Sequence, residues 1–243
     1  MIFYYNLQPI TYNLIFAFSF GLSALSFILY CMALFQRKPQ LGSSLPLYRL
    51  GLQKTLLIIG LGNPGKEYDG TRHNIGFACL DHFAKKLEFP DWIVKKNLHS
   101  QISQLTVSDS RVILMKPTTF MNLSGKAAGA VQHFYKVPIS QIIVVHDELD
   151  VDFGQIRNRV GGGAAGHNGV KSLIEHLGEG FGRIRIGINN KSANEMDSTD
   201  FVLSKFSKEE QAQIDMLLRE TTSILSEFAH GQPLLTETRS FII

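Results

Sequence analysis

Short apolar runs alternate with amphipathic stretches along most of the chain and predict strands and helices in turn. Residues 56–60, LLIIG, predict a short buried strand, and apolar residues at helical spacing over 75–87 predict a helix. Further strands are predicted at residues 102–107, 112–115, 141–145, 155–159 and 183–188, and further helices at 124–134, 170–177 and 214–228. Strands interleaved with helices predict an α/β fold with a mostly parallel or mixed sheet.

Polar residues mark several predicted element boundaries. Ser124 is expected to cap a helix whose apolar positions are Ala127, Ala128, Val131 and Phe134. The strand at residues 141–145 is expected to end at the polar triplet 146–148, and a glycine-rich loop precedes the helix at 170–177. Because ligand sites in open α/β sheets form where strands end, these boundaries are the expected place for chemistry.

The first 53 residues differ in character from the rest. Residues 14–35 form a run of 22 without a charge, Pro or Asn, which meets the length of about 20 needed to span a bilayer. Basic residues follow the run, so an anchor here would leave the remainder in the cytoplasm. A leader upstream of the true start and a targeting segment are the alternatives. Residues 39–53 are interpreted as a linker, and residues 54–243 as the globular domain.

Composition adds modest constraints. A chain of 243 residues with 44% hydrophobic residues suits one globular domain with a good core after the apolar segment. The net charge of +3 is compatible with an anionic partner but is weak evidence for one. Cys31 and Cys79 form no C-x-x-C pair and no disulfide framework, which favours a reducing compartment.

Three polar clusters, at residues 63–73, 118–122 and 146–168, could carry chemistry. Together they supply an imidazole, a carboxylate and three carboxamides, from His73, Asp147, Asn63, Asn122 and Asn168. Each residue alone could be a turn, cap or core residue. As a set they provide a base, a group to orient it and neutral hydrogen-bond donors, which acyl hydrolysis requires. A serine nucleophile is not indicated, because the chain has no G-x-S-x-G motif.

Two other interpretations are weaker. Gly60, Gly62 and Gly65 fit the G-x-G-x-x-G dinucleotide fingerprint, but a polar segment follows them where a packed helix should begin. A metal site could be assembled from His73, His146, Asp147 and His167, yet these residues lack the H-x-x-x-H spacing typical of such sites. Neither a metal nor a cofactor is therefore expected.

Six motifs in order resemble those of bacterial-type peptidyl-tRNA hydrolase. They are GLGNPGKEYDGTRHNIGF, KPTTFMNLSGKA, HDELD, GHNGVKS, FGRIRIGI and DFVLSKF, and they cover residues 54 to about 229. The resemblance implies a single α/β domain with a twisted mixed β-sheet flanked by helices, usually monomeric. It also implies hydrolysis of the ester that joins a peptide to the 3′ ribose of tRNA, in the cytoplasm.

The resemblance assigns roles in the reaction to residues in these motifs. His73 would be the general base that activates water, Asp147 would hold it, and Asn63 would position the substrate. Asn122 and Asn168 would bind the peptide part. The remaining residues of the expected cleft are Tyr68, Met121 and a supporting His167.

The resemblance also implies a tRNA-binding surface. Arg159 and Arg185 would clamp phosphates, with Lys171 nearby, and the spacing of Arg157 and Arg183 adds them to a basic rim.

Two departures from the family pattern affect this region. Ala165 stands where the family usually has Gly, which implies strain if that position needs a positive φ. Residues 189–191, NNK, replace a Gly-x-Pro segment. The alternative function is a catalytically idle member that acts as an RNA-binding or scaffold protein, and the retention of His73 and Asp147 disfavours it.

Overall fold

The computed structural model describes residues 54–190, 193 and 196–241. The expected membrane span at 14–35, the linker and Cys31 lie outside these residues. Within them, no helix is long and apolar enough to cross a membrane.

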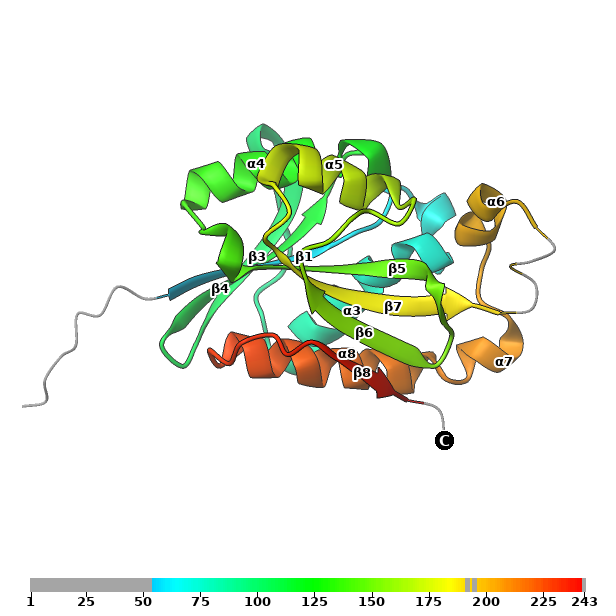
Figure 1. Ribbon diagram of the computed structural model, residues 1–243. Helices are drawn as coiled ribbons and strands as arrows, with labels where there is room; N and C mark the ends of the chain where they lie inside the picture. The colour runs from blue at the N-terminus through cyan, green and yellow to red at the C-terminus, as the bar shows by residue number, and fades with distance from the viewer. Residues whose placement is uncertain (1–53, 191–192, 194–195, 242–243) are drawn as a thin grey trace, which may run out of the picture. The chain divides into compact units, whose positions relative to one another are not determined.

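The described residues form one mixed sheet of eight strands (Figure 1). In spatial order the strands are β2 (Ile93–Lys95), β3 (Ser100–Val107), β4 (Ser110–Pro117), β1 (Lys54–Gly60), β5 (Ile142–Asp152), β7 (Gly182–Asn189), β6 (Gln155–Val160) and β8 (Glu237–Ser240). The central strands β4, β1, β5 and β7 run parallel, and the outer pairs are antiparallel. The expected mixed sheet is confirmed.

Helices cover both faces of this sheet. α4 (Ser124–Tyr135) and α5 (Asn168–Leu177) pack on one face, and α3 (Ile75–Lys86) and α8 (Ile214–Ala229) pack on the other (Figure 1). The short helices α6 (Ser198–Leu203) and α7 (Lys208–Gln211) lie between β7 and α8 in the chain. The run of β1 is apolar throughout because both faces of this strand are buried. Leu56 and Ile58 belong to the core under α3 and α8, and Leu57 and Ile59 belong to the core under α4 and α5.

The connection from β1 to α3 brings the polar motif onto the ends of the central strands. Two three-residue 3₁₀ turns, η1 (Lys66–Tyr68) and η2 (Arg72–Asn74), precede α3. Gly76 then lets the helix approach the sheet, because a Cβ there would lie 2.5 Å from the carbonyl oxygens of Leu61 and Val145. The dinucleotide fingerprint is not realised, since a 3₁₀ turn and not a helix follows its third glycine.

Most predicted elements are present, with three local differences. β5 does not end before residues 146–148 but continues to Asp152, paired with β7. Ser124 is the first residue of α4 and caps nothing, because the preceding 3₁₀ turn η4 (Met121–Leu123) moves the N-cap position to Leu123. Phe134 is 60% exposed, since Tyr135 packs against the core in the last turn of α4 instead.

Candidate active site

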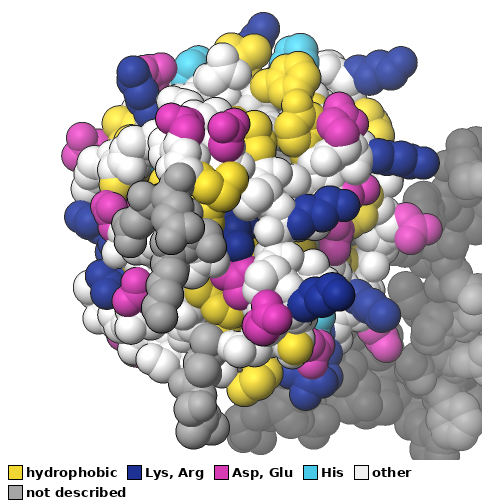
Figure 2. Space-filling view, turned by 90° about the vertical axis from the view of Figure 1, so that its right-hand side faces the viewer, with side chains coloured by type: hydrophobic (Ala, Val, Ile, Leu, Met, Phe, Trp, Pro, Cys, Tyr) yellow, Lys and Arg dark blue, Asp and Glu magenta, His cyan; other side chains and the backbone are white. Residues whose placement is uncertain are grey.

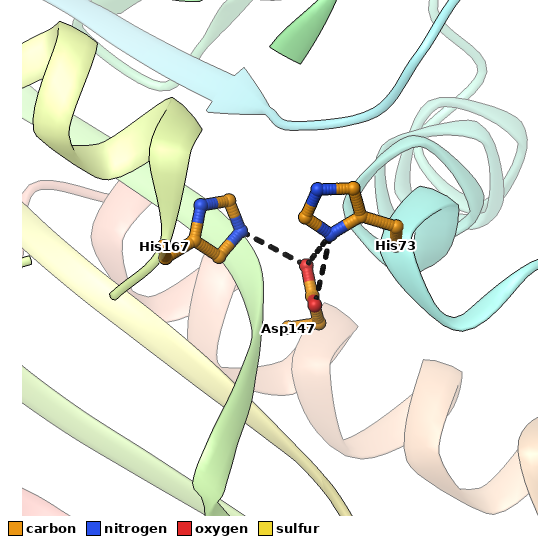
Figure 3. A group of neighbouring side chains, drawn as sticks. All are labelled: His73, Asp147 and His167. Carbon is orange, nitrogen blue, oxygen red and sulfur yellow. Dashed lines mark hydrogen bonds and ion pairs between the residues drawn. The ribbon is translucent and has the colours of Figure 1, made fainter. Parts of the chain in front are cut away.

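His73 and Asp147 meet just beyond the carboxyl end of β1, whose last residue Gly60 pairs with Val145. η2 carries His73, β5 carries Asp147, and Nδ1 of the ring lies 3.0 Å from each carboxylate oxygen (Figure 3). An ionised carboxylate only accepts hydrogen bonds, so Nδ1 carries the proton and donates it to Asp147. The other ring nitrogen, Nε2, points away from Asp147 (Figure 3) with its lone pair available. This tautomer is the one that a general base needs.

His167 contacts the same carboxylate through Nε2, whereas His73 uses Nδ1. Its Nε2 lies 3.0 Å from Oδ1 of Asp147, while its Nδ1 accepts the backbone N–H groups of Gly169 and Val170 at the start of α5. A nitrogen that accepts two hydrogen bonds carries no proton, so Nε2 must be the donor to Asp147. These contacts hold His167 in one orientation, as a helix cap and a support for the carboxylate.

The electrostatics of the cluster keep Asp147 charged and His146 neutral. Burial alone would raise the pKa of the Asp147 carboxyl, but attraction to the rings of His167 and His73 and their hydrogen bonds hold it well below its usual range. Burial, reinforced by His167, lowers the pKa of His146 to about 3. His146 donates from Nδ1 to the backbone oxygen of Asp147, and its buried Nε2 has no partner among the described residues. It is not a second base.

Asn63 is locked with its amide nitrogen free. Its Oδ1 accepts the backbone N–H of Met121 at 2.8 Å. Asn74 holds its backbone from both sides, because Oδ1 of Asn74 accepts the N–H of Asn63 and Nδ2 donates to the carbonyl oxygen of Asn63. The orientation leaves Nδ2 of Asn63 as a fixed donor, the arrangement that stabilises a developing oxyanion.

These groups open into a cleft of about 550 Å³, within the range of small-ligand sites. It is lined by eight of the residues discussed so far or expected from the sequence, namely Asn63, His73, Met121, Asn122, Asp147, Ala165, His167 and Asn168, together with parts of β5 and α6. The side chains of Asn122 and Asn168 are exposed and make no hydrogen bond to other described residues. Tyr68 does not line the cleft; its ring lies edge-on to Phe120, which does.

The arginines expected to hold tRNA lie in a neighbouring groove of about 450 Å³. Arg157, Arg159 and Arg185 line it, on adjacent strands β6 and β7. Glu148 links the groove to the cleft, because it lines the cleft and accepts from Nε of Arg185 at 2.9 Å. The antiparallel register of β6 and β7 thus gathers these side chains on one face of the sheet.

Two other basic residues are placed differently. Arg183 is not part of the rim, since it is buried and donates to the carbonyl oxygens of Gly162 and Gly163. Burial, then repulsion from Arg159 and Arg185, lowers its pKa, which shows how closely the positive charges are packed. Lys171 is exposed on α5 and lines neither the cleft nor the groove.

The end of the domain where β5 and β7 finish carries charges of both signs. Figure 2 shows Lys and Arg side chains interspersed with acidic and apolar ones there, without one continuous basic patch.

Three of the four residues considered as metal ligands do come together. His73, Asp147 and His167 offer ligand atoms within 4.8 Å of one another. Hydrogen bonds already account for this arrangement. Because His167 carries its proton on Nε2, that nitrogen has no lone pair to offer an ion.

The departures from the family pattern have visible consequences. Ala165 adopts φ 48°, the left-handed region that favours glycine, so the expected strain is present. In the segment that replaces Gly-x-Pro, Asn190 donates from Nδ2 to Oε1 of Glu210 at 2.7 Å. The loop after β7 is therefore tied to α7.

The sequence interpretation missed several contributors to the site. Asn74 acts through hydrogen bonds to Asn63, and Glu148 through one to Arg185 on β7. α6 supplies a wall of the cleft. For Asn74 and Glu148, the only available signal was that they directly follow His73 and Asp147 in the chain.

A histidine–carboxylate pair facing a cleft with neutral carboxamides defines a hydrolase that activates water. The chain belongs to the peptidyl-tRNA hydrolase family, whose model matches residues 57–240. It is 46% identical over 167 residues to the peptidyl-tRNA hydrolase of Rickettsia bellii (strain RML369-C), covering 69% of this chain and 89% of that protein. The Bacillus pumilus (strain SAFR-032) relative is 42% identical over 187 residues, covering 76% and 97%. A crystal structure of peptidyl-tRNA hydrolase from Acinetobacter baumannii has a TM-score of 0.64 and 34% identity, covering 76% and 97%.

Proposed function

We propose that the protein hydrolyses the ester between an N-blocked peptide and the 3′ ribose of tRNA. The observation that carries this proposal is the His73–Asp147 pair, which leaves Nε2 of His73 free beside the cleft. Family membership supports the same substrate. Water attacks the ester carbonyl carbon and gives a proton to Nε2 of His73. The bond from that carbon to the 3′ oxygen breaks, and the proton passes to the departing oxygen.

Asp147 stabilises the imidazolium that forms on His73 during the attack. The oxyanion receives a hydrogen bond from Nδ2 of Asn63, whose orientation is fixed before the substrate binds. No covalent enzyme intermediate is needed, which agrees with the absence of a serine nucleophile motif from the sequence.

The carboxamides of Asn122 and Asn168 bind the peptide backbone, with Met121 beside them and His167 in support, while Tyr68 packs behind Phe120. Carboxamides offer both donors and acceptors without charge. A free α-amino group would bring an ammonium against them, and the loss of its hydration costs free energy. This difference accounts for a preference for N-blocked substrates over ordinary aminoacyl-tRNA.

The tRNA backbone is held by Arg159 and Arg185, with Lys171 further along α5. The fork of donors on arginine matches phosphate oxygens. Because Arg185 also pairs with Glu148, phosphate binding beside the cleft is linked to the strand that carries Asp147.

The enzyme acts as a monomer in the cytoplasm. Residues 14–35 are proposed as its membrane contact where they are retained in the mature protein.

Release of free tRNA from N-acetyl-aminoacyl-tRNA by the purified protein tests the proposal. We expect turnover that falls by about 10²–10⁴ in His73→Ala. Tight tRNA binding without any release of free tRNA would favour the idle RNA-binding alternative instead.

A further inference from the structure

A buried ion pair lies directly behind the catalytic turn. Arg72 and Glu210 are 3% and 7% exposed, and the guanidinium makes a two-pronged contact, Nη1 to Oε1 at 3.0 Å and Nη2 to Oε2 at 2.7 Å. The rings of Phe201 and Phe206 flank it at 4.5 and 4.8 Å. Buried ion pairs are often no more stabilising than apolar residues of similar size, so stability alone is a weak reason for this one.

Arg72 is fastened to the segment that follows α6. It precedes His73 in η2, its backbone N–H donates to the carbonyl oxygen of Ser204, and its Nε donates to Oγ of the same serine. A bridge between Thr71 and Lys205 continues this contact. The turn that presents His73 is thus attached on its rear side to residues about 130 positions later in the chain.

Glu210 connects Arg72 to residues on both sides of α6 in the chain. Its carboxylate accepts the N–H of Ser207 and Nδ2 of Asn190, in addition to both prongs of Arg72. Phe201, which lies against the guanidinium, belongs to α6, and α6 lines the cleft. Hydrogen bonds from these groups, led by Arg72, lower the pKa of Glu210 although burial opposes this.

We propose that Arg72 and Glu210 are positioning residues, which together set the place of His73 relative to the α6 wall of the cleft. The pair acts on catalysis through the turn and the helix, without touching substrate. The inference rests on the proposed role of His73.

Two single substitutions loosen the pair. Arg72→Lys keeps the charge but loses the fork and the stacking, and Glu210→Gln keeps the shape but removes the charge and one acceptor. Because a shift of about 1 Å in a reacting group can cost roughly 100-fold, we expect kcat on N-acetyl-aminoacyl-tRNA to fall by roughly 10- to 100-fold in each. The ¹⁵N resonances of the His73 ring should also shift from their wild-type positions in each variant.

Arg239→Lys is the matched control. Arg239 pairs with Glu220, Glu227 and Glu237 on β8 and α8 and does not line the cleft. We expect a lower Tm in this variant, with unchanged kcat and unchanged His73 resonances. Tm is measured for every variant. The kcat values are then compared at one temperature well below the lowest Tm.

The double variant Arg72→Met/Glu210→Leu separates positioning from stability. Apolar replacement of a buried pair often preserves stability. A double variant with the wild-type Tm and a low kcat supports the proposal, and one that recovers wild-type kcat overturns it. Wild-type kcat and His73 resonances in Arg72→Lys and Glu210→Gln also overturn it. Failure of the proposed function is distinct, because it appears as no release of free tRNA by the wild-type protein. Failure of the proposed role of His73 appears as full activity in His73→Ala.

Discussion

One carboxylate serves two histidines that do different work. His73 and His167 both donate to Asp147, yet only His167 has its remaining nitrogen occupied by backbone N–H groups. The N-terminus of α5 therefore fixes one ring as a support and leaves Nε2 of the other free. The proposal that His73 is the base rests on its hydrogen bonds and not on burial, since both histidines are 9% exposed.

His73→Ala should lower kcat by about 10²–10⁴, the usual contribution of a positioned base, with substrate binding largely retained. Asp147→Asn should lower the rate less, because the imidazole remains. Single-turnover kinetics on N-acetyl-aminoacyl-tRNA measure both. His133→Ala, on the exposed face of α4, is the control. Near wild-type turnover in His73→Ala would show that another group activates the water.

Ala165→Gly should stabilise the protein by about 1 kcal/mol. Left-handed backbone costs an alanine roughly 1–2 kcal/mol, and the greater freedom of glycine in the unfolded chain offsets part of the gain. Urea denaturation measures the difference. The neighbouring Ala164→Gly is the control and should be destabilising, since φ at Ala164 is negative. A loss of stability in Ala165→Gly would mean that other contacts of its methyl group outweigh the strain.

At the scale of elements, changes from an apolar run to a polar motif explain why the candidate catalytic residues could be proposed from the sequence. Asn63, His73, Asp147 and Asn168 all stand where an apolar run changes to a polar motif. Their partners could not be predicted, because the Asn63–Asn74 and Glu148–Arg185 contacts depend on turn geometry and strand register. The prediction that Arg183 belongs to the rim was wrong for a similar reason. Arg183 does pair with Arg159 across β6 and β7, but its guanidinium donates to the carbonyl oxygen of Gly163 in the glycine loop.

Arg159→Ala should raise KM for whole tRNA substrates but not for short acyl-nucleotide fragments. It lines the groove on β6 and no described carboxylate pairs with it, so a phosphate can take its donors. The salt dependence of binding should fall by about one released counterion. Arg219→Ala, an exposed residue of α8, is the control. Equal losses on tRNA and on fragment would assign Arg159 to the fold or the chemistry instead.

For the whole molecule, the α/β architecture was predictable because long apolar and amphipathic runs build its central elements. The short edge strands β2 and β8 and the short helices α6 and α7 were missed. Their sequences carry little apolar periodicity, and the exposed or half-buried residues of β2 and β8 confirm that burial does not define these strands. Pairing with longer neighbours creates them.

A protein that starts at Leu52 should fold and be fully active. Among the described residues, both cores and every residue of the cleft follow this position. The full chain should instead partition into membranes or aggregate, because a run of 22 uncharged residues is an aggregation hazard when exposed. Specific activity and membrane flotation of the two proteins measure this. Loss of most activity in the shorter protein would place residues 1–51 in the domain.

His146 should make the whole fold sensitive to mild acid. Its pKa is about 3 in the folded protein against an ordinary 6.5, so between these values the unfolded chain binds a proton that the folded one does not. The contribution of His146 to the free energy of unfolding is complete above about pH 6.5. Below that pH it falls by about 1.4 kcal/mol per pH unit. Asp147 adds to the loss only below about pH 4, since its folded pKa is depressed.

Urea denaturation at pH 7 and pH 5 therefore isolates His146. The loss of unfolding free energy between the two should be smaller by about 2 kcal/mol in His146→Gln than in the wild type. Only this difference is compared, because the substitution also changes stability at pH 7. His133→Gln, whose side chain is exposed, should keep the wild-type dependence. The same pH dependence in His146→Gln and wild type would show that the buried imidazole is protonated, or exposed to water, in the folded protein.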